Sequence, residues 1–190
     1  AYDVGLAATG PLVLHGQNGY SVKSAAGQAS HYYSQPFFQV SGNLTLPEGS
    51  IPVTGQAWLD REWSSQPLAQ DQTGWDWFSL SFDTGDKLMG FVLRGVTDFT
   101  AATWIAADGS ATALPDGAFA ATPLAQHTVA GRDVPVEWHV RLAERGVDVT
   151  VQALNPQAWM ATSVPYWEGP VQVSGSHAGV GYLEMTGYQD

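Results

Sequence analysis

Apolar and polar positions alternate with a period of two along most of the chain. No window of about a dozen residues carries the 3.6-residue apolar stripe of an amphipathic helix. In the segment Val147–Ala153, apolar residues occupy every second position, and Asp148, Thr150 and Gln152 stand between them. Such alternation is typical of a strand with one buried and one solvated face. The segment Val134–Leu142 alternates in the same way, so we expect a hairpin. The pattern predicts an all-β protein.

Further strands are expected along the rest of the chain. They are Tyr2–Ala8, Val40–Leu46, Ile51–Trp58, Trp75–Phe82, Leu88–Arg94, Ala101–Ala106, Ala158–Thr162, Trp167–Ser174 and Gly181–Thr186. Turn sequences rich in Asp and Gly separate them at short intervals, which favours a barrel or a sandwich. The segment His15–His31 has few apolar residues and is predicted as a loop. A domain boundary, if present, is expected near Leu46–Ser50.

Composition and charge exclude several classes of function. The 190 residues, 44% of them hydrophobic and only 13% charged, suffice for a folded core. A net charge of −11 argues against nucleic acid and anionic membranes as partners. The absence of cysteine excludes disulfides, thiolate chemistry and Cys-ligated metals. No signal peptide or transmembrane segment is recognised, so the compartment stays open.

The motifs of metal and nucleotide chemistry are missing from the sequence. The histidines His15, His31, His127, His139 and His177 lack the i, i+2 or i, i+4 spacing of a zinc site. No phosphate-binding loop or dinucleotide fingerprint is present, and Ser176 is one place off the spacing of a nucleophile elbow. We therefore expect no metal and no cofactor.

Tryptophan is concentrated in one stretch of the chain. Four of the eight tryptophans, Trp58, Trp63, Trp75 and Trp77, lie within 20 residues of one another. Large rings can simply fill a wide barrel. Their clustering nevertheless favours a ligand pocket that takes a small lipophilic molecule.

Carboxylates accompany these rings. Alternation along Trp75–Phe82 puts Asp76 on the apolar face, opposite the face of Trp75 and Trp77. Desolvation there would raise its pKa and suit it to act as a general acid, whereas an ion pair with Arg61 or Arg94 would lower the pKa.

The segment Trp58–Trp63 brings two more carboxylates to one side of an expected strand. If it is extended, Asp60 and Glu62 point the same way as Trp58. Two close carboxyl groups can share a proton, which raises one pKa. Two acids near the end of an exposed strand can also be merely solvated.

Several blocks of sequence resemble one family. The blocks are YYS (32–34), GQAWLDREW (55–63), GWDWFSLSFDTGDKLMGFVLR (74–94) and YWEGPVQVSGSHAGVGYLEMTGY (166–188), with HGQNGYSVKS (15–24) in family order. They are similar to the carotenoid 1,2-hydratase and AttH-like lipocalin family. The resemblance implies a lipocalin-like (calycin) antiparallel barrel.

Members of this family have two consecutive barrels in a longer chain. The resemblance therefore implies that residues 1–49 are strands of a partial first barrel and that residues 50–190 form the C-terminal lipocalin-like domain. Either an N-terminal half is missing, or a second copy of the chain covers the open edges in a homodimer.

The resemblance also implies roles for particular residues. Asp76 would protonate an alkene, and Asp60 or Glu62 would orient water. The rings of Trp58, Trp63, Trp75, Trp77, Tyr33 and Trp167 would bind the substrate. The predicted function is cofactor-independent, acid-assisted hydration or cyclisation of a polyene or prenyl-like substrate. The alternatives are a Diels–Alder-type pericyclase and a non-catalytic lipid- or pigment-binding protein. Arg61 and Gly74 depart from the hydratase pattern, which has His and an aromatic residue there.

Overall fold

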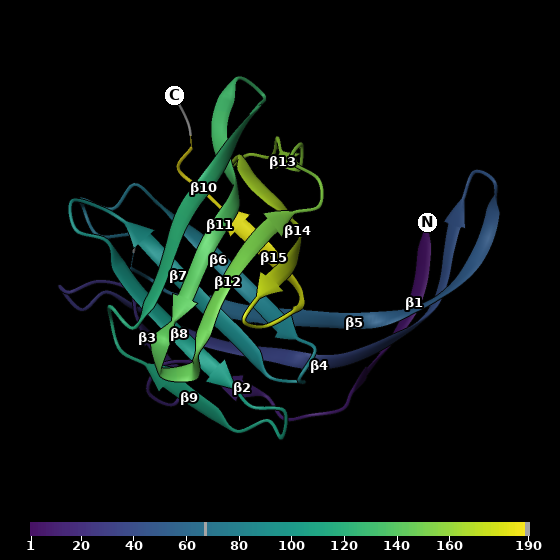
Figure 1. Cartoon of the computed structure of the whole chain (residues 1–190), viewed down its shortest axis with the longest axis horizontal. Helices are drawn as coiled ribbons and strands as arrows, with labels where there is room; N and C mark the ends of the chain where they lie inside the picture. The colour runs from purple at the N-terminus through teal and green to yellow at the C-terminus, as the bar shows by residue number, and fades with distance from the viewer. Residues whose placement is uncertain (67, 189–190) are drawn as a thin grey trace.

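The computed structural model describes residues 1–66 and 68–188, and its regular elements are strands joined by turns and one short 3-10 helix (Figure 1). The predicted all-β class is confirmed. The strands are β1 (Tyr2–Ala8), β2 (Val13–Leu14), β3 (Tyr20–Val22), β4 (Ala29–Leu46), β5 (Gly49–Trp63), β6 (Gly74–Phe82), β7 (Lys87–Arg94), β8 (Phe99–Ile105), β9 (Ala111–Leu114), β10 (Phe119–Val129), β11 (Arg132–Leu142), β12 (Val147–Ala153), β13 (Trp159–Met160), β14 (Tyr166–Gly175) and β15 (Gly179–Met185); η1 is Ala143–Arg145. No helix in this part of the chain is long and apolar enough to span a membrane.

The first five strands form an N-terminal sheet around the long strand β4. Strand β4 pairs with β1, β2, β3 and β5, all antiparallel. The β4–β5 hairpin has its turn at Pro47 and Glu48, and its distal part projects with β1 as an arm away from the rest of the molecule (Figure 1). Most residues of β1 are exposed on both faces, so this arm has no core of its own.

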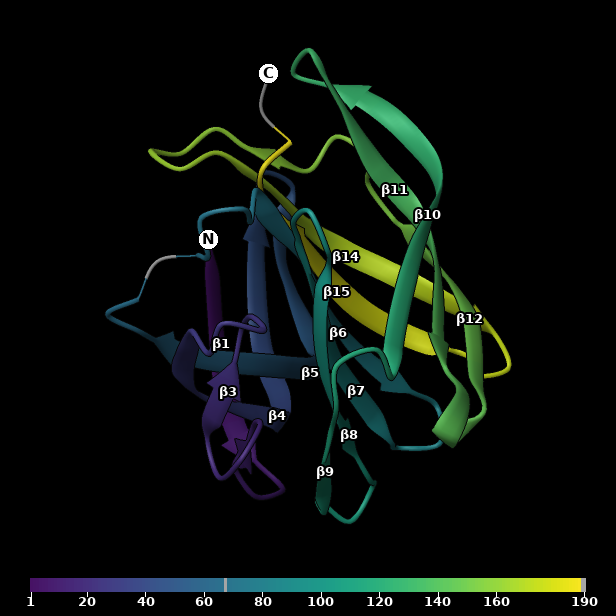
Figure 2. The same ribbon diagram turned by 90° about the vertical axis from the view of Figure 1, so that its left-hand side faces the viewer.

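The remaining strands form a curled antiparallel half-barrel. Their order is β10-β11-β12-β14-β15-β6-β7-β8-β9, and β13 adds to β14. Figure 2 shows β3, β4 and β5 on one side of β6–β8, with β10–β12 on the other side. The central strands β6 and β7 are therefore covered on both faces.

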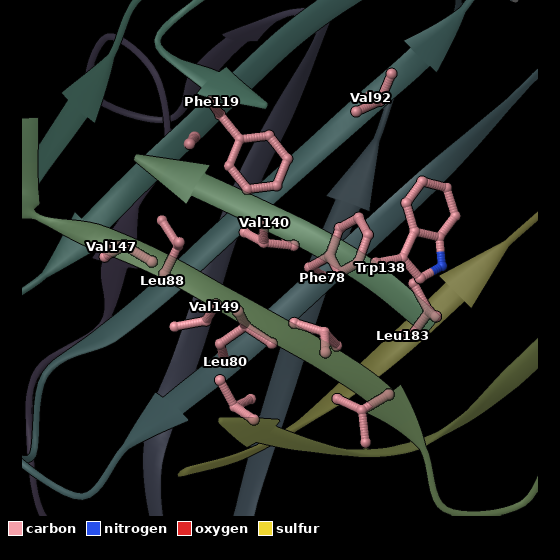
Figure 3. Packing of buried hydrophobic residues seen from close by; sticks show 14 of the residues in the cluster. Phe78, Leu80, Leu88, Val92, Phe119, Trp138, Val140, Val147, Val149 and Leu183 are labelled. Atoms are coloured by element: carbon pink, nitrogen blue, oxygen red, sulfur yellow. The ribbon is translucent and has the colours of Figure 1, made fainter. Parts of the chain in front are cut away.

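The two faces of β6 and β7 serve two separate apolar clusters. Inside the half-barrel, Phe78 and Leu80 of β6 pack against Phe119, Trp138 and the valines of β11, β12 and β14 (Figure 3). On the outer face, Met89, Phe91 and Leu93 of β7 pack against Tyr32 of the N-terminal sheet. Strand β7 is buried almost throughout, which explains its nearly continuous apolar sequence.

Most of the predicted strands are present, but four are not among the predictions. Strand β3 lies in the segment predicted as a loop, β2 lies just before that segment, and β9 and β10 fall between the predicted strands. Most positions of β10 are exposed, so its sequence shows little alternation. The predicted start at Val40 misses the first 11 residues of β4. Several buried positions in this part of the strand are polar, among them Ser30, Ser34 and Gln35, so the apolar alternation is absent there.

The predicted boundary near Leu46–Ser50 coincides with the turn between β4 and β5. The chain changes from the first sheet to the second later, between Trp63 and Gly74. A division into residues 1–49 and 50–190 stays a prediction.

Candidate functional site

A cavity of about 880 Å³ lies between the N-terminal sheet and the outer face of the half-barrel. Strands β4 and β5 form one wall, and β6, β7, β14 and β15 form the other. This volume is in the range of sites for drug-sized ligands. All four clustered tryptophans line it, together with Tyr32, Phe91, Lys23, Asp60, Glu62, Glu168 and Glu184.

The polar atoms of three tryptophans are bonded to other groups of the wall. The indole Nε1 of Trp75 donates to Glu184 Oε1 at 2.7 Å, and that of Trp58 donates to Asp60 Oδ1 at 3.0 Å. The indole of Trp77 donates to the Tyr32 hydroxyl at 2.9 Å, which joins the two sheets. These bonds fix the rings, so the wall presents aromatic surface to an occupant.

Trp63 lies at the edge of the cavity. Its side chain is 53% exposed, and it stacks on His31 with ring centroids 5.6 Å apart. This ring can therefore contact both an occupant and solvent.

Four carboxyl groups and one ammonium group line the same space. Lys23 Nζ pairs with Glu62 Oε1 at 2.7 Å, and Ser30 donates to Glu62 at 2.5 Å. Burial raises the pKa of Glu184, and repulsion from neighbouring carboxylates adds to the effect. Burial lowers the pKa of Lys23 even though Glu62 opposes this shift. The cavity therefore carries more acidic than basic groups.

Asp60 is a cavity carboxyl group that several side chains hold by hydrogen bonds. Its Oδ1 accepts hydrogen bonds from Trp58 and from Ser34. Burial raises the pKa of Asp60, although Ser34, Trp58 and Tyr32 each act against this shift by bonding to the charged form. Asp60 therefore holds its proton to a higher pH than an exposed aspartate does.

Behind Asp60 the hydrogen bonds continue into a fully buried region. Ser34 Oγ lies 2.6 Å from His15 Nε2, and His15 Nδ1 lies 2.9 Å from Thr103 Oγ1 on β8. Burial, assisted by the nearby charge of Lys23, lowers the pKa of His15 to about 3. His15 is therefore neutral at physiological pH.

The set of Ser34, His15 and Asp60 does not form a hydrolytic triad. In a triad, histidine lies between serine and the carboxylate and activates an accessible hydroxyl. Here Ser34 lies between the other two side chains, and its exposed fraction is 0%. Ser34 therefore cannot act as a nucleophile towards a molecule in the cavity.

Asp76 lies on the other face of β6 and does not line the cavity. It is 1% exposed, and it accepts hydrogen bonds from Arg94 Nε and the Tyr188 hydroxyl, both at 3.0 Å. Arg94 also donates to the Thr186 carbonyl. Burial raises the pKa of Asp76 to about 6, more than Arg94 lowers it. The ion-pair hypothesis thus names Arg94 correctly as a partner of Asp76. It predicts a lowered pKa for Asp76, however, and the pKa is raised.

The prediction that Asp76 lies on the face of β6 opposite Trp75 and Trp77 is confirmed, and the cavity lies on the tryptophan face. Successive side chains of a strand point to opposite faces, so Asp76 is directed away from its neighbours Trp75 and Trp77. The structure brings together Asp60, Glu62 and the four tryptophans, and it leaves Asp76 outside this group.

Two predicted substrate-binding rings also lie outside the cavity lining. Trp167 is 0% exposed in the half-barrel core, where its Nε1 donates to Pro156 O at 2.9 Å. Tyr33 makes an edge contact with Trp63, with centroids 6.2 Å apart. In each case the neighbouring residue, Glu168 or Tyr32, lines the cavity instead.

The two positions that depart from the hydratase pattern lie outside the cavity lining. Arg61 is exposed on β5. At Gly74, an added Cβ would lie 2.4 Å from the Thr186 carbonyl oxygen and 2.8 Å from Arg94 Nη2. This backbone therefore has no room for an aromatic residue at position 74.

Sequence reasoning missed Tyr32, Lys23, His15, Glu168 and Glu184. Glu168 and Glu184 alternate with buried residues on β14 and β15. Their side chains therefore point to the face of the sheet that is opposite the half-barrel core. Alternation through YWEG and YLEM separates them from the core residues, but it does not show that their face meets a cavity. His15 lies in the segment predicted as a loop, and nothing in its local pattern indicates burial. Among the described residues, no group of three potential ligands could hold a metal ion.

Comparison with known proteins gives one family and a set of similar structures. The model of a family described as AttH-like matches residues 1–188. A crystal structure described as an AttH protein from Nitrosomonas europaea superposes with a TM-score of 0.89 at 36% identity, covering 98% of this chain and 61% of that one. Kievitone hydratase from Nectria haematococca superposes with a TM-score of 0.80 at 21% identity, covering 97% of this chain and 60% of that one. The chain thus spans about three-fifths of either protein. No curated protein matches the sequence significantly.

Proposed function

Because the chain belongs to the AttH-like family and places carboxyl groups among tryptophans in one cavity, we propose that it is a cofactor-independent enzyme that protonates a lipophilic, unsaturated substrate. The product then forms by addition of water or by ring closure. Kievitone hydratase is a hydratase by name, which supports hydration as the first candidate. The substrate class is polyene or prenyl-like, because long apolar chains match an aromatic cavity of this volume.

The observation that carries this proposal is the position of Asp60. It lines the cavity beside Trp58, on the same wall as Glu62 and Trp63, with Trp75 and Trp77 on the other wall. Burial raises its pKa, and a general acid works best when its pKa is close to the working pH. We therefore assign the proton-donor role to Asp60, in place of Asp76.

The reaction needs only a proton and water. The π electrons of the alkene form a new C–H bond with the proton of Asp60, and the electron pair of the broken O–H bond stays on Asp60. The carbocation faces tryptophan rings, and such contacts are worth about 2 kcal/mol when desolvated. In hydration, water adds to the cation, and its surplus proton passes to Glu62, which is paired with Lys23, and later returns to Asp60. In cyclisation, a second double bond attacks the cation, and the ring then loses a proton to a carboxylate.

Turnover in deuterated water tests this proposal. A panel of prenyl alcohols, polyenes and prenylated phenols is incubated with the protein, and products are examined by mass spectrometry. We expect a product with a carbon-bound deuterium from wild type, and a loss of about 100-fold or more in Asp60→Asn, as is typical for a general acid.

Asp76→Asn is the matched variant on the other face of the same sheet. It should retain the deuterated product, because Asp76 does not line the cavity. If Asp76→Asn lost turnover and Asp60→Asn retained it, the assignment of the donor would be overturned.

The volume and aromatic lining of the cavity also favour a second candidate, a protein that binds a lipid or pigment without converting it. Tight quenching of tryptophan fluorescence by a ligand that is recovered unchanged and free of deuterium would support it. A pericyclase is the third outcome. It would produce a cyclised product that carries no solvent deuterium and that still forms in Asp60→Asn, because catalysis would depend on the shape of the cavity.

A further inference from the structure

A continuous row of buried polar side chains runs from the half-barrel to the cavity. It starts at Thr103 on β8, passes through His15 and Ser34, and ends at Asp60 on β5. Thr103 is 1% exposed, and His15 and Ser34 are both 0% exposed. Buried polar groups of this kind are costly unless each is bonded, and here all of them are.

The chemistry of these groups fixes the direction of every hydrogen bond in the row. Ser34 has one hydroxyl proton and donates it to Asp60 Oδ1, so its oxygen must accept a proton from His15 Nε2. Neutral His15 carries one ring proton, which is therefore on Nε2. Its Nδ1 accepts the hydroxyl proton of Thr103. The row thus selects one tautomer of His15.

We propose that His15 is a positioning residue for Asp60: acting through Ser34, it holds the carboxyl group in place and makes it give up its proton more readily. This inference rests on the proposed function only in identifying Asp60 as the acid. The hydrogen bond from His15 polarises the Ser34 hydroxyl and makes it a better donor. That donor stabilises the carboxylate that remains after Asp60 has lost its proton.

The arrangement also fixes which oxygen of Asp60 carries the acidic proton. Oδ1 accepts both Ser34 Oγ and Trp58 Nε1, so the proton of the acid form belongs on Oδ2. Other groups that act on Asp60 are Glu62, whose charge favours the protonated form, and Tyr32, which bonds to the charged form. The charges of Lys23 and Glu184 also interact with that of Asp60. Lys23 is the charged group that acts on His15.

The bond between Trp58 and Asp60 provides a direct measurement. The eight indole groups each give one cross-peak in a ¹⁵N–¹H spectrum, and Trp58→Phe identifies the peak of Trp58. That peak should shift with pH as Asp60 titrates. The ¹⁵N shifts of His15 should show a proton on Nε2, none on Nδ1, and no titration between about pH 5 and 8.

Three variants test the direction of the effect. Ser34→Ala removes the donor to Asp60 and should raise the titration midpoint by about one pKa unit. His15→Leu leaves Ser34 in place and should raise it by less. His15→Gln keeps an N–H donor to Ser34 and should restore the wild-type midpoint. Thr150→Val, on β12 of the half-barrel, should leave the midpoint unchanged.

A proton on Nδ1 of His15 in the wild-type protein would overturn the proposal, and this measurement needs no folded variant. An Asp60 midpoint in His15→Leu equal to that of wild type would overturn it as well. These measurements do not involve turnover. If the midpoints shift as expected and no substrate is converted, the proposed function fails while the positioning role of His15 stands.

Discussion

Lowering the pH from 7 to 5 should stabilise the folded protein through protonation of Asp76. Protonation of carboxylates in folded proteins usually destabilises them instead. The folded-state pKa of Asp76 is about 6, whereas the ordinary value is 3.8. The folded state therefore binds the proton more tightly than the unfolded state does. The stabilisation is fully present below pH 3.8 and is lost as the pH rises through 6.

The magnitude follows from the two pKa values. Each unit of difference corresponds to about 1.4 kcal/mol, so complete protonation is worth about 3 kcal/mol. At pH 5 the contribution is about 1.4 kcal/mol, and at pH 7 it is close to zero. Asp76 is 1% exposed, so screening by solvent does not reduce this value.

Urea unfolding at several pH values measures this contribution. The other titrating groups cancel when the free energy of unfolding of Asp76→Asn is subtracted from that of wild type at each pH. Asparagine keeps a carbonyl oxygen that can accept from Arg94 or Tyr188, so the variant should fold. The difference should shift in favour of wild type by about 1.4 kcal/mol between pH 7 and 5. A difference that is flat, or that shifts against wild type on acidification, would refute the argument that burial outweighs the charge of Arg94 at this site.

Three further predictions concern packing, ligand charge and assembly. Gly74→Ala should cost about 1–3 kcal/mol of stability in urea unfolding because its Cβ meets backbone at 2.4 Å, whereas Gly55→Ala, with nothing within 4 Å, should be close to neutral. Because acidic groups outnumber basic ones in the cavity, decyltrimethylammonium should quench tryptophan fluorescence at a lower concentration than decyl sulfate does. Glu184→Gln should weaken that binding about fivefold and Glu48→Gln should not; equal affinity for both detergents would contradict the charge argument. Finally, we propose that the arm formed by β1, β4 and β5 pairs with a second copy of the chain. Light scattering after size-exclusion chromatography should then give a dimer, and Leu6→Lys on the exposed edge should dissociate it. A 20 kDa monomer of wild type at high concentration would contradict this.

The fold class could be predicted because alternation along a strand is a local property. The segments around Val147 and Trp138 alternate cleanly, and both are strands. Strand β10 could not be found in this way because it is mostly exposed, and neither could the first part of β4, whose interior positions include Ser30 and Ser34. In these segments tertiary contacts determine the strand more than the apolar pattern does.

The aromatic cavity could be predicted from the four tryptophans, but not which other residues join them. Alternation separates Asp76 from Trp75 and Trp77, yet it does not tell which face of β6 meets a cavity. That depends on β4 and β5 lying across the half-barrel, a long-range contact without a local signal. For the same reason Tyr33 and Trp167 were predicted to line the cavity, whereas their neighbours Tyr32 and Glu168 line it.

Strand β6 has no solvent-facing side, since one face belongs to the half-barrel core and the other to the cavity. Substitutions along it should therefore alternate in their phenotype from one residue to the next. Changes at Phe78 or Leu80 would affect whether the protein folds, and changes at Trp77 or Ser79 would affect which molecule it accepts. Such a strand allows ligand preference to diverge among descendants while the core residues that fold the chain stay the same. Selection can then act on the two properties through separate positions only one residue apart.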